Sequence, residues 1–278
     1  VDGGKAKAEK GGDTCAGKEE DEGISLTLKE MGYLPGCNGA DAAIVDANEM
    51  DRILPVLDAA DAESQLAAMA DGAAYVELFK DYGKEIRVAL TRVGGRPVGL
   101  VVGNGKENDG VLTAQSASKA ARFIRLCDCY SLPVVSLINS KGVAVPTVDE
   151  QAATIKATTQ LLYAYAEATT AKVSIVTGNA IGQAYVAMGG KSNADVTYAW
   201  PGAVISALTP EAAVQVLYTD DLKADKKPAL QSRAELEAKF AADVAVGVAA
   251  AAAGMVDDVI DPAETRKSVI AAFEILLS

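Results

Sequence analysis

The 278-residue sequence contains no histidine. This absence excludes Ser-His-Asp and Cys-His catalysis and leaves few possible ligands for a zinc site. The only cysteines, Cys15, Cys37, Cys127 and Cys129, form no CxxC pair, and we interpret them as reduced core thiols of a cytoplasmic protein. We therefore expect neither a metal centre nor a histidine-assisted nucleophile.

Positive charge and long apolar runs are also scarce. The chain has 26 Lys and Arg residues against 38 Asp and Glu residues, which gives a formal net charge of −12. This balance disfavours nucleic acid or an anionic membrane surface as a partner. No apolar run approaches the roughly 20 residues of a membrane span, and the charged, glycine-rich start does not resemble a signal peptide. Hydrophobic residues make up 50% of the chain, so it can bury a large core.

The stretch 172–201 is the part of the sequence in which we expect chemistry. Residues 172–177 are rich in β-branched side chains and predict a buried strand. Gly178 and Asn179 are typical strand breakers, so we place the end of the strand there. The pattern indicates a strand, a glycine turn, a short helix and a second strand.

The turn itself contains Gly182, Gln183 and Ala184, followed by small residues that suit a helix. The first amides of a helix have no internal partner, so the amides of Gln183 and Ala184 could bind an oxyanion. Gly182 would let a substrate approach the backbone. The alternative is that Gly-X-Ala only permits close packing of a helix on a strand.

Elsewhere the pattern alternates strands and helices. Residues 75–79 and 86–93 alternate with period 2, which predicts strands open to solvent on one face, and Gly94-Gly95 predicts a hairpin. Ser116 is the expected N-cap of a helix that ends at Tyr130. We expect further strands at 97–102, 134–138 and 196–200, a helix at 149–168, and a solvated helix face formed by Lys119, Arg122 and Arg125.

Seven ordered blocks carry a resemblance to a known family. The blocks span residues 95–102, 119–128, 132–135, 161–169, 182–188, 195–201 and 254–260. In this order they resemble the beta-type carboxyltransferase subunits of biotin-dependent acyl-CoA carboxylases and decarboxylases, a two-domain branch of the crotonase superfamily. The likeness lies in the carboxy-terminal domain of those subunits.

The resemblance implies a fold and a division into domains. The fold would be α/β, a crotonase-like spiral of repeated strand-strand-helix units. Residues 1–38 would be the tail of an amino-terminal carboxyltransferase domain with a linker, and residues 39–278 the carboxy-terminal domain. Expected partners are a biotin carboxyl carrier protein, the amino-terminal domain or subunit, and further copies in a dimer-based oligomer that could extend to a hexamer.

The resemblance also implies a reaction and a site. Family members move a carboxyl group between carrier-bound biotin and a short acyl-CoA, with backbone amides stabilising the oxyanions. Carried over to this sequence, the oxyanion hole is Gly182, Gln183 and Ala184. Tyr185, Val186 and Gly142 would contact substrate, with Val186 at the position that selects the acyl chain. The family has glycine at the position of Gln183, where a positive φ would cost about 1–2 kcal/mol.

Two functions other than carboxyl transfer are considered for this sequence. Enoyl-CoA hydratases of the same superfamily use paired glutamates, but Glu150 and Glu167 lie 17 residues apart on one expected helix, or about 25 Å. We interpret both as solvated or capping charges. A non-catalytic subunit that keeps the fold for assembly is the second alternative, and the altered turn at Gln183 is compatible with it.

Overall fold

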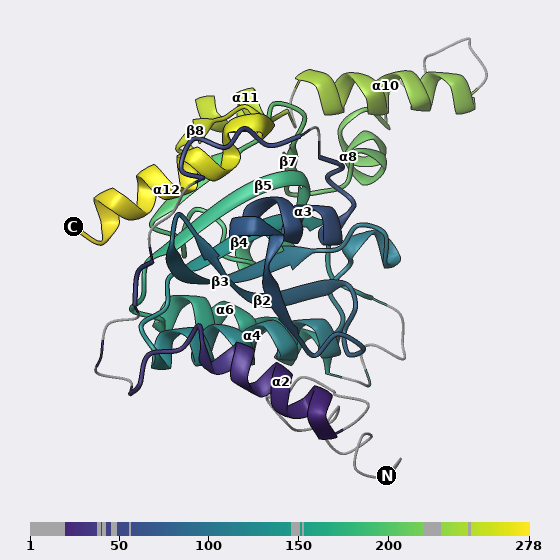
Figure 1. The fold of residues 1–278 in the computed structure, drawn as a ribbon. Coiled ribbons are helices and arrows are strands. Elements are labelled where there is room, and N and C mark those ends of the chain that lie inside the picture. The colour runs from purple at the N-terminus through teal and green to yellow at the C-terminus, as the bar shows by residue number, and fades with distance from the viewer. Residues whose placement is uncertain are drawn as a thin grey trace.

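A mixed sheet forms the centre of the molecule (Figure 1). The computed structural model describes residues 20–37, 40, 43–45, 49–55, 57–145, 151, 153–219, 229–243 and 246–278. Within these residues the strand order is β1-β2-β3-β4-β5-β6-β8, and β7 pairs with β5 off this path. The strands are β1 (Tyr75–Leu78), β2 (Ile86–Val93), β3 (Arg96–Gly103), β4 (Val134–Ser140), β5 (Lys172–Ile181), β6 (Val196–Ala199), β7 (Val204–Ser206) and β8 (Asp258–Val259).

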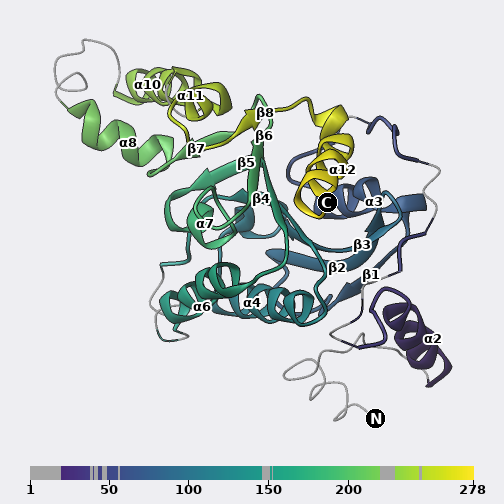
Figure 2. The ribbon, with the colours of Figure 1, turned by 90° about the vertical axis from the view of Figure 1, so that its left-hand side faces the viewer.

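Helices cover both faces of this sheet (Figure 2). On one face α4 (Ala114–Cys129) and α6 (Thr154–Glu167) pack against each other and bury one large apolar cluster. On the other face α3 (Ala62–Met69) and α12 (Thr265–Leu276) bury a second cluster. The other helices are α2 (Glu20–Met31), α7 (Gly182–Ala187), α8 (Pro210–Leu217), α10 (Ala229–Asp243) and α11 (Gly247–Ala252). Short 3-10 turns occur at Asp71–Ala73, Asn108–Gly110 and Pro262–Glu264.

The expected hairpin at Gly94-Gly95 is confirmed, because β2 and β3 pair antiparallel through Val93 and Arg96. Both glycines have positive φ, 61° and 77°, which a two-residue turn between twisted strands requires. The expected open face of β2 is wrong. Val88 faces one apolar cluster and its neighbour Ala89 faces the other, since helices cover both sides of the strand.

Strand β5 is longer than the sequence pattern predicts. It continues through Gly178 and Asn179 to Ile181, so the expected break at these two residues is wrong. The extension is held on one side by β7, which pairs with residues 179–181, and on the other by Asn139, whose Oδ1 accepts a hydrogen bond of 2.9 Å from the Asn179 amide. Pairing partners distant in sequence thus override the local strand-breaking tendency.

Helix α4 differs from the expectation at two places. Thr113 is its N-cap, and Ser116 completes a capping box at the third helical position instead of capping the helix itself. Lys119 does not lie on a solvated face: its side chain is buried, and Nζ donates to the carbonyls of Tyr82 at 2.8 Å and Gly83 at 3.4 Å. The helix therefore presents only Arg122 and Arg125 of the three cations to solvent.

The acidic and thiol side chains follow a mixed pattern. Glu167 is exposed and pairs with Arg125 at 2.5 Å, as a solvated charge should, while Glu150 lies outside the described residues. Cys127 is buried, but Cys37 and Cys129 are exposed free thiols, so the expectation of core cysteines is wrong for these two. Cys15 also lies outside the described residues.

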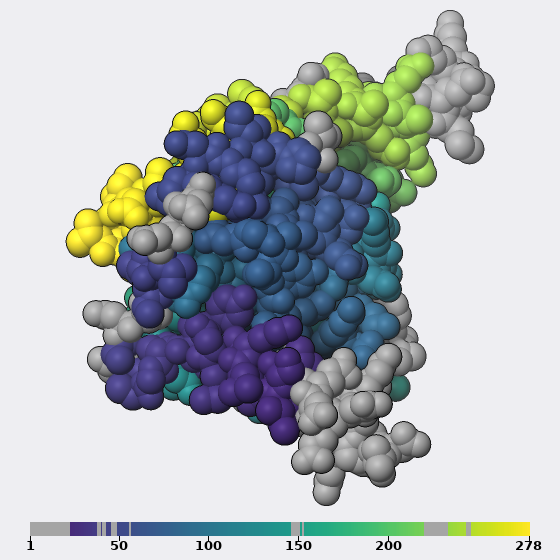
Figure 3. All heavy atoms as spheres, in the orientation of Figure 1, coloured from purple at the N-terminus to yellow at the C-terminus, as the bar shows by residue number. Residues whose placement is uncertain are grey.

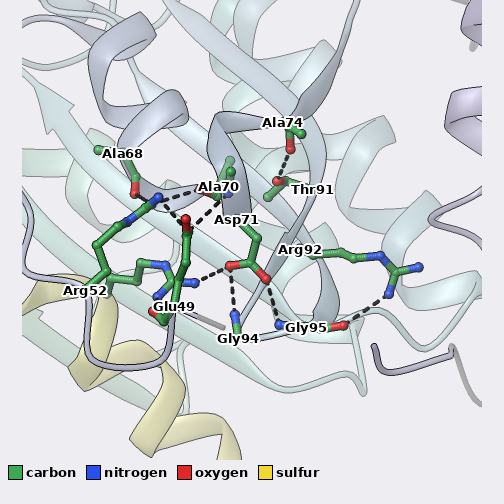
Figure 4. A network of polar contacts seen from close by, with 12 residues as sticks. Glu49, Arg52, Ala68, Ala70, Asp71, Ala74, Thr91, Arg92, Gly94 and Gly95 are labelled. Carbon is green, nitrogen blue, oxygen red and sulfur yellow. Dashed lines mark hydrogen bonds and ion pairs between the residues drawn. The ribbon is translucent and has the colours of Figure 1, made fainter. Parts of the chain in front are cut away.

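The segment that precedes α3 meets the segment that precedes α12 on the face of the sheet that α12 covers. The Leu54 amide donates to the Ala263 carbonyl at 2.9 Å, and Figure 3 shows the segment around residue 54 beside the yellow C-terminal part. Below this contact Asp71 accepts hydrogen bonds from the amides of Gly94 at 3.1 Å and Gly95 at 2.7 Å (Figure 4). A polar network therefore joins the hairpin to the segment that precedes β1.

Candidate active site

The turn after β5 contains the first positions that we expect to act. Gly182 has φ +55°, and a Cβ atom there would lie 3.0 Å from the Ala207 carbonyl oxygen. Glycine is therefore required at this point, both for the left-handed backbone and for the close approach of the chain beyond β7. Gln183 has no positive φ, so the condition for backbone strain at this residue is not met: Gly182 takes the left-handed conformation instead.

Helix α7 has one buried face and one exposed face. Ala184 is fully buried, whereas Gln183 is exposed and Val186 is 41% exposed. Tyr185 is half-buried, and its hydroxyl donates to the Met255 carbonyl at 2.5 Å and accepts from the Lys191 amide at 3.2 Å. Desolvation by burial raises the pKa of Tyr185, so this side chain is a fixed neutral donor at neutral pH.

A cavity of about 610 Å³ opens beside α7. Its wall is formed by α6, by α7, by the end of β7 with the residue that follows it, and by the segment that precedes β8. The volume falls in the range of small-molecule sites. Its lining residues are Ile155, Thr158, Thr159, Leu162, Gly182, Gln183, Tyr185, Val186, Ala187, Ile205, Ser206, Ala207 and Met255.

A second cavity of about 330 Å³ adjoins the first. Gly142 lies on its wall with φ +134°, in the loop that follows β4. Ile155, Gly182, Gln183 and Ala207 line both cavities, so the turn after β5 is a floor common to the two. Among the described residues that line either cavity, none carries a charge.

Asn139 holds the last part of β5, which leads into this floor, and no pattern in the sequence predicts that role. Its Nδ2 donates to the Ala59 carbonyl at 2.6 Å, while its Oδ1 receives the Asn179 amide. A Cβ atom on Gly178 would lie 2.6 Å from Asn139 Oδ1, so the glycine makes room for this side chain. In the sequence, the available signal for this role is an asparagine directly after the predicted strand 134–138. Its partners are distant in the sequence, so the signal does not identify them.

The predicted site residues lie together with one exception. Gly182 and Gln183 line both cavities, Tyr185 and Val186 line the larger, and Gly142 lines the smaller. Ala184 lies beneath the floor, in neither lining. Ile155, Ala207 and Met255 are lining residues that the sequence analysis missed, because the fold brings them to α7 from separate elements and no local motif marks them.

Two further observations concern the described part of the chain. Its Cys, Asp and Glu side chains form no cluster of three that could hold a metal ion. No helix there has the length and apolar character needed to cross a bilayer. The site geometry thus consists of backbone groups, apolar side chains and a few neutral polar groups around two adjoining cavities.

A glycine turn and a short helix follow the carboxyl end of a sheet strand. This arrangement is typical of α/β proteins that have a cleft at the amino terminus of a helix. Residues 3–278 match the carboxyl transferase domain model, and the chain belongs to this family. The chain is 35% identical over 270 residues to the carboxyltransferase subunit of propionyl-CoA carboxylase from Haloferax mediterranei, covering 93% of this chain and 52% of that protein. It is 33% identical over 267 residues to the methylmalonyl-CoA carboxyltransferase 12S subunit of Propionibacterium freudenreichii subsp. shermanii, covering 92% and 51%.

Solved structures agree with this membership. The transcarboxylase 12S crystal structure with methylmalonyl-coenzyme A and methylmalonic acid bound superposes with a TM-score of 0.84 at 32% identity, covering 93% of this chain and 52% of that one. The expected crotonase-like α/β fold is confirmed by this likeness. The chain spans about half the length of the relatives that it matches.

Proposed function

We propose that the chain is the biotin-side half of a carboxyltransferase, which moves a carboxyl group between carrier-bound biotin and a short acyl-CoA. The observation that carries the proposal is the floor formed by Gly182 and Gln183, which two adjoining cavities share. Two substrates that exchange a group must meet at one point, and a common floor provides that point. Membership of the carboxyl transferase domain family supports the reaction class.

The proposed chemistry relies on backbone groups. Carrier-bound carboxybiotin supplies the carboxyl group, and its ureido nitrogen is left to take up the α-proton of the acyl-CoA. In this proposal the amides of Gln183 and Ala184 stabilise an oxyanion that develops during transfer, since fixed dipoles in an uncharged site need no reorganisation. Gly182 keeps the backbone accessible, and Tyr185, Val186 and Gly142 contact the substrates.

The proposal extends to partners and to the layout of the chain. A biotin carboxyl carrier protein would deliver biotin, and an amino-terminal domain or subunit would complete the site with the acyl-CoA contacts. Residues 1–38 would be the tail of such a domain, and 39–278 the carboxy-terminal domain. Further copies would form a dimer-based homo-oligomer, in line with the hexamer described for transcarboxylase 12S. Free thiols at Cys37, Cys127 and Cys129 are compatible with the cytoplasm as the location.

Carboxyl transfer from malonyl-CoA and from methylmalonyl-CoA to a biotinylated carrier tests the proposal. The assay uses the 278-residue chain alone and the chain with a candidate amino-terminal domain, with products identified by mass. We expect turnover only in the mixture. Failure of both samples to turn over, together with failure to bind acyl-CoA or biotin, would reject the proposal in favour of a non-catalytic assembly subunit.

A further inference from the structure

Almost every polar side chain that lines the two cavities forms a hydrogen bond with a backbone group or another partner within the chain. Thr158 Oγ1 donates to the Thr154 carbonyl at 2.9 Å, and Thr159 Oγ1 donates to the Ile155 carbonyl at 2.8 Å. Ser206 Oγ accepts the Leu208 amide at 3.4 Å, Thr209 Oγ1 caps α8 by accepting the Ala212 amide at 3.3 Å, and Thr154 has a partner as well. The first four of these hydroxyls are each oriented by a partner in their own segment of the chain, although Ser206 and Thr209 keep the O–H donor and Thr158 and Thr159 keep acceptor capacity.

Gln183 differs from the other lining side chains. It is exposed, it lies on the floor common to both cavities, and within the described part of the chain its carboxamide makes no hydrogen bond. A carboxamide offers one carbonyl acceptor and one NH₂ donor side by side in a plane. The site therefore presents a neutral donor-acceptor pair in otherwise apolar or self-bonded surroundings.

The charge of the lining limits what this pair can recognise. No described lining residue carries a positive charge, so the lining distinguishes ligands by hydrogen bonds and apolar contact and not by a fixed countercharge. A thioester carbonyl is neutral but only accepts hydrogen bonds, so it would use one half of the carboxamide. A cyclic urea has an N–H donor next to a C=O acceptor and satisfies both halves at once.

We propose that the Gln183 carboxamide recognises the ureido ring of carrier-bound biotin. Its carbonyl oxygen accepts from the ring N–H that does not carry the transferred carboxyl, and its NH₂ group donates to the ureido oxygen. The inference rests on the proposed function, which makes biotin a substrate of this floor, and adds a side-chain contact that selects one of the two substrates. Gln183 then acts as a specificity residue, in addition to the proposed role of its backbone amide.

A binding experiment on the 278-residue chain tests this pairing directly. The chain is labelled with ¹⁵N-glutamine, the side-chain signal of Gln183 is assigned by its loss in Gln183→Met, and 2-imidazolidinone is added as the cyclic urea probe. The matched probe is 1,3-dimethyl-2-imidazolidinone, which keeps the carbonyl but lacks both N–H groups. We expect the Gln183 signal to shift saturably with the first probe and the methylated probe to bind roughly tenfold more weakly. Equal binding of the two probes, or no shift with either, would overturn the inference.

A kinetic experiment separates this inference from the proposed function. In the mixture that turns over, Gln183→Met keeps the length of the side chain but removes both hydrogen bonds, so KM for the biotinylated carrier should rise roughly tenfold while KM for acyl-CoA stays within about twofold. Gln160→Met is the matched control, since Gln160 is exposed on α6 and lines neither cavity.

The outcomes have distinct meanings. Turnover with an unchanged carrier KM in Gln183→Met would overturn the inference and leave the proposed function standing. An increase confined to the acyl-CoA KM would also overturn it, because the carboxamide would then face the other substrate. Absence of turnover in the mixture with the unmodified chain, together with failure to bind acyl-CoA or biotin, would reject the proposed function, while the probe titration would still report on Gln183.

Discussion

Arg266 of α12 forms an ion pair with Asp71, a residue 195 positions earlier in the sequence. The Arg266 side chain is fully buried, and its second guanidinium nitrogen donates to the Glu49 carbonyl. Asp71 is the same residue that holds the amides of the Gly94-Gly95 turn (Figure 4). One carboxylate therefore joins the last helix of the described chain to the hairpin that connects β2 and β3.

Loss of the Asp71 carboxylate should destabilise the fold strongly. Asp71→Ala leaves a buried guanidinium without its counterion and removes two hydrogen bonds to the hairpin amides, so we expect the free energy of unfolding to fall by about 3 kcal/mol or more. Urea denaturation measures this change. The control is Glu167→Ala, which breaks the exposed pair with Arg125 and should cost less than about 1 kcal/mol. Equal losses in the two variants would contradict the assigned role of Asp71.

Lys119 should give stability an unusual dependence on pH. Burial lowers the pKa of Lys119 to about 8 from the ordinary value of 10.5. Between these two values the unfolded chain binds a proton that the folded chain does not, so this group makes the folded state more stable as pH rises through the window. Below about pH 8 the folded chain carries the full penalty of the buried charge, up to about 3 kcal/mol.

The comparison with Lys119→Met isolates this effect. We expect the stability of the unmodified chain relative to Lys119→Met to increase between pH 8 and pH 10, measured by urea denaturation at each pH. Lys156→Met alters an exposed lysine of α6 and should show no such trend. A flat difference for Lys119→Met across the window would show that the ammonium is adequately solvated in the folded state.

Substitution of Gly182 should affect carboxyl transfer more than stability. Gly182→Ala places a Cβ atom 3.0 Å from the Ala207 carbonyl oxygen at a φ of +55°, so either α7 or the segment beyond β7 must move. We expect transfer in the reconstituted mixture to fall more than tenfold, with about 1–2 kcal/mol lost in stability. Gly72→Ala matches the strain, with φ +58° and no atom within 4 Å, and should lose stability but keep activity. Full activity in Gly182→Ala would remove this turn from the site.

Val186 should influence which acyl group is accepted. Its side chain lines the larger cavity, and Val186→Phe would fill part of that space. We expect kcat/KM for propionyl-CoA to fall roughly tenfold relative to acetyl-CoA, since one methylene in an apolar pocket is worth about that factor. Val216→Phe on α8 is the control, because Val216 is exposed and lines neither cavity. An unchanged ratio in Val186→Phe would place the acyl group elsewhere.

Local patterns in the sequence predict much of the fold. The hairpin at Gly94-Gly95 and the buried strands follow from turn residues and β-branched runs that act over a few positions. The glycine turn at Gly182 is likewise visible in the sequence, and the structure places it at the floor of a cavity. Position on the surface is less predictable: Lys119 has the spacing of a solvated cation, yet the loop containing Tyr82 and Gly83 covers it.

Apart from the N-cap of α4, which is Thr113 instead of Ser116, the wrong predictions about strands and helices concern contacts between residues distant in the sequence. Asn179 reads as a strand breaker, but β7 and Asn139 supply the partners that extend β5 through it. The roles of Ile155 and Met255 in the cavity wall are invisible for the same reason, since each lies on a separate element with no motif of its own. A single sequence gives local preference, whereas these features are decided by tertiary pairing.

Asn139 also has a consequence for mutational scanning of this family member. Cβ atoms on Gly105 and Gly178 would strike its side chain at 2.7 Å and 2.6 Å, whereas Cβ atoms on Gly103 and Gly110 would strike its backbone oxygen at 2.7 Å and 2.2 Å. With Asn139 shortened to glycine, alanine at the first two positions no longer meets the side chain, while the other two remain blocked. Single substitutions to alanine should therefore be tolerated poorly at all four glycines. Double variants that also carry Asn139→Gly should divide the four positions into two classes.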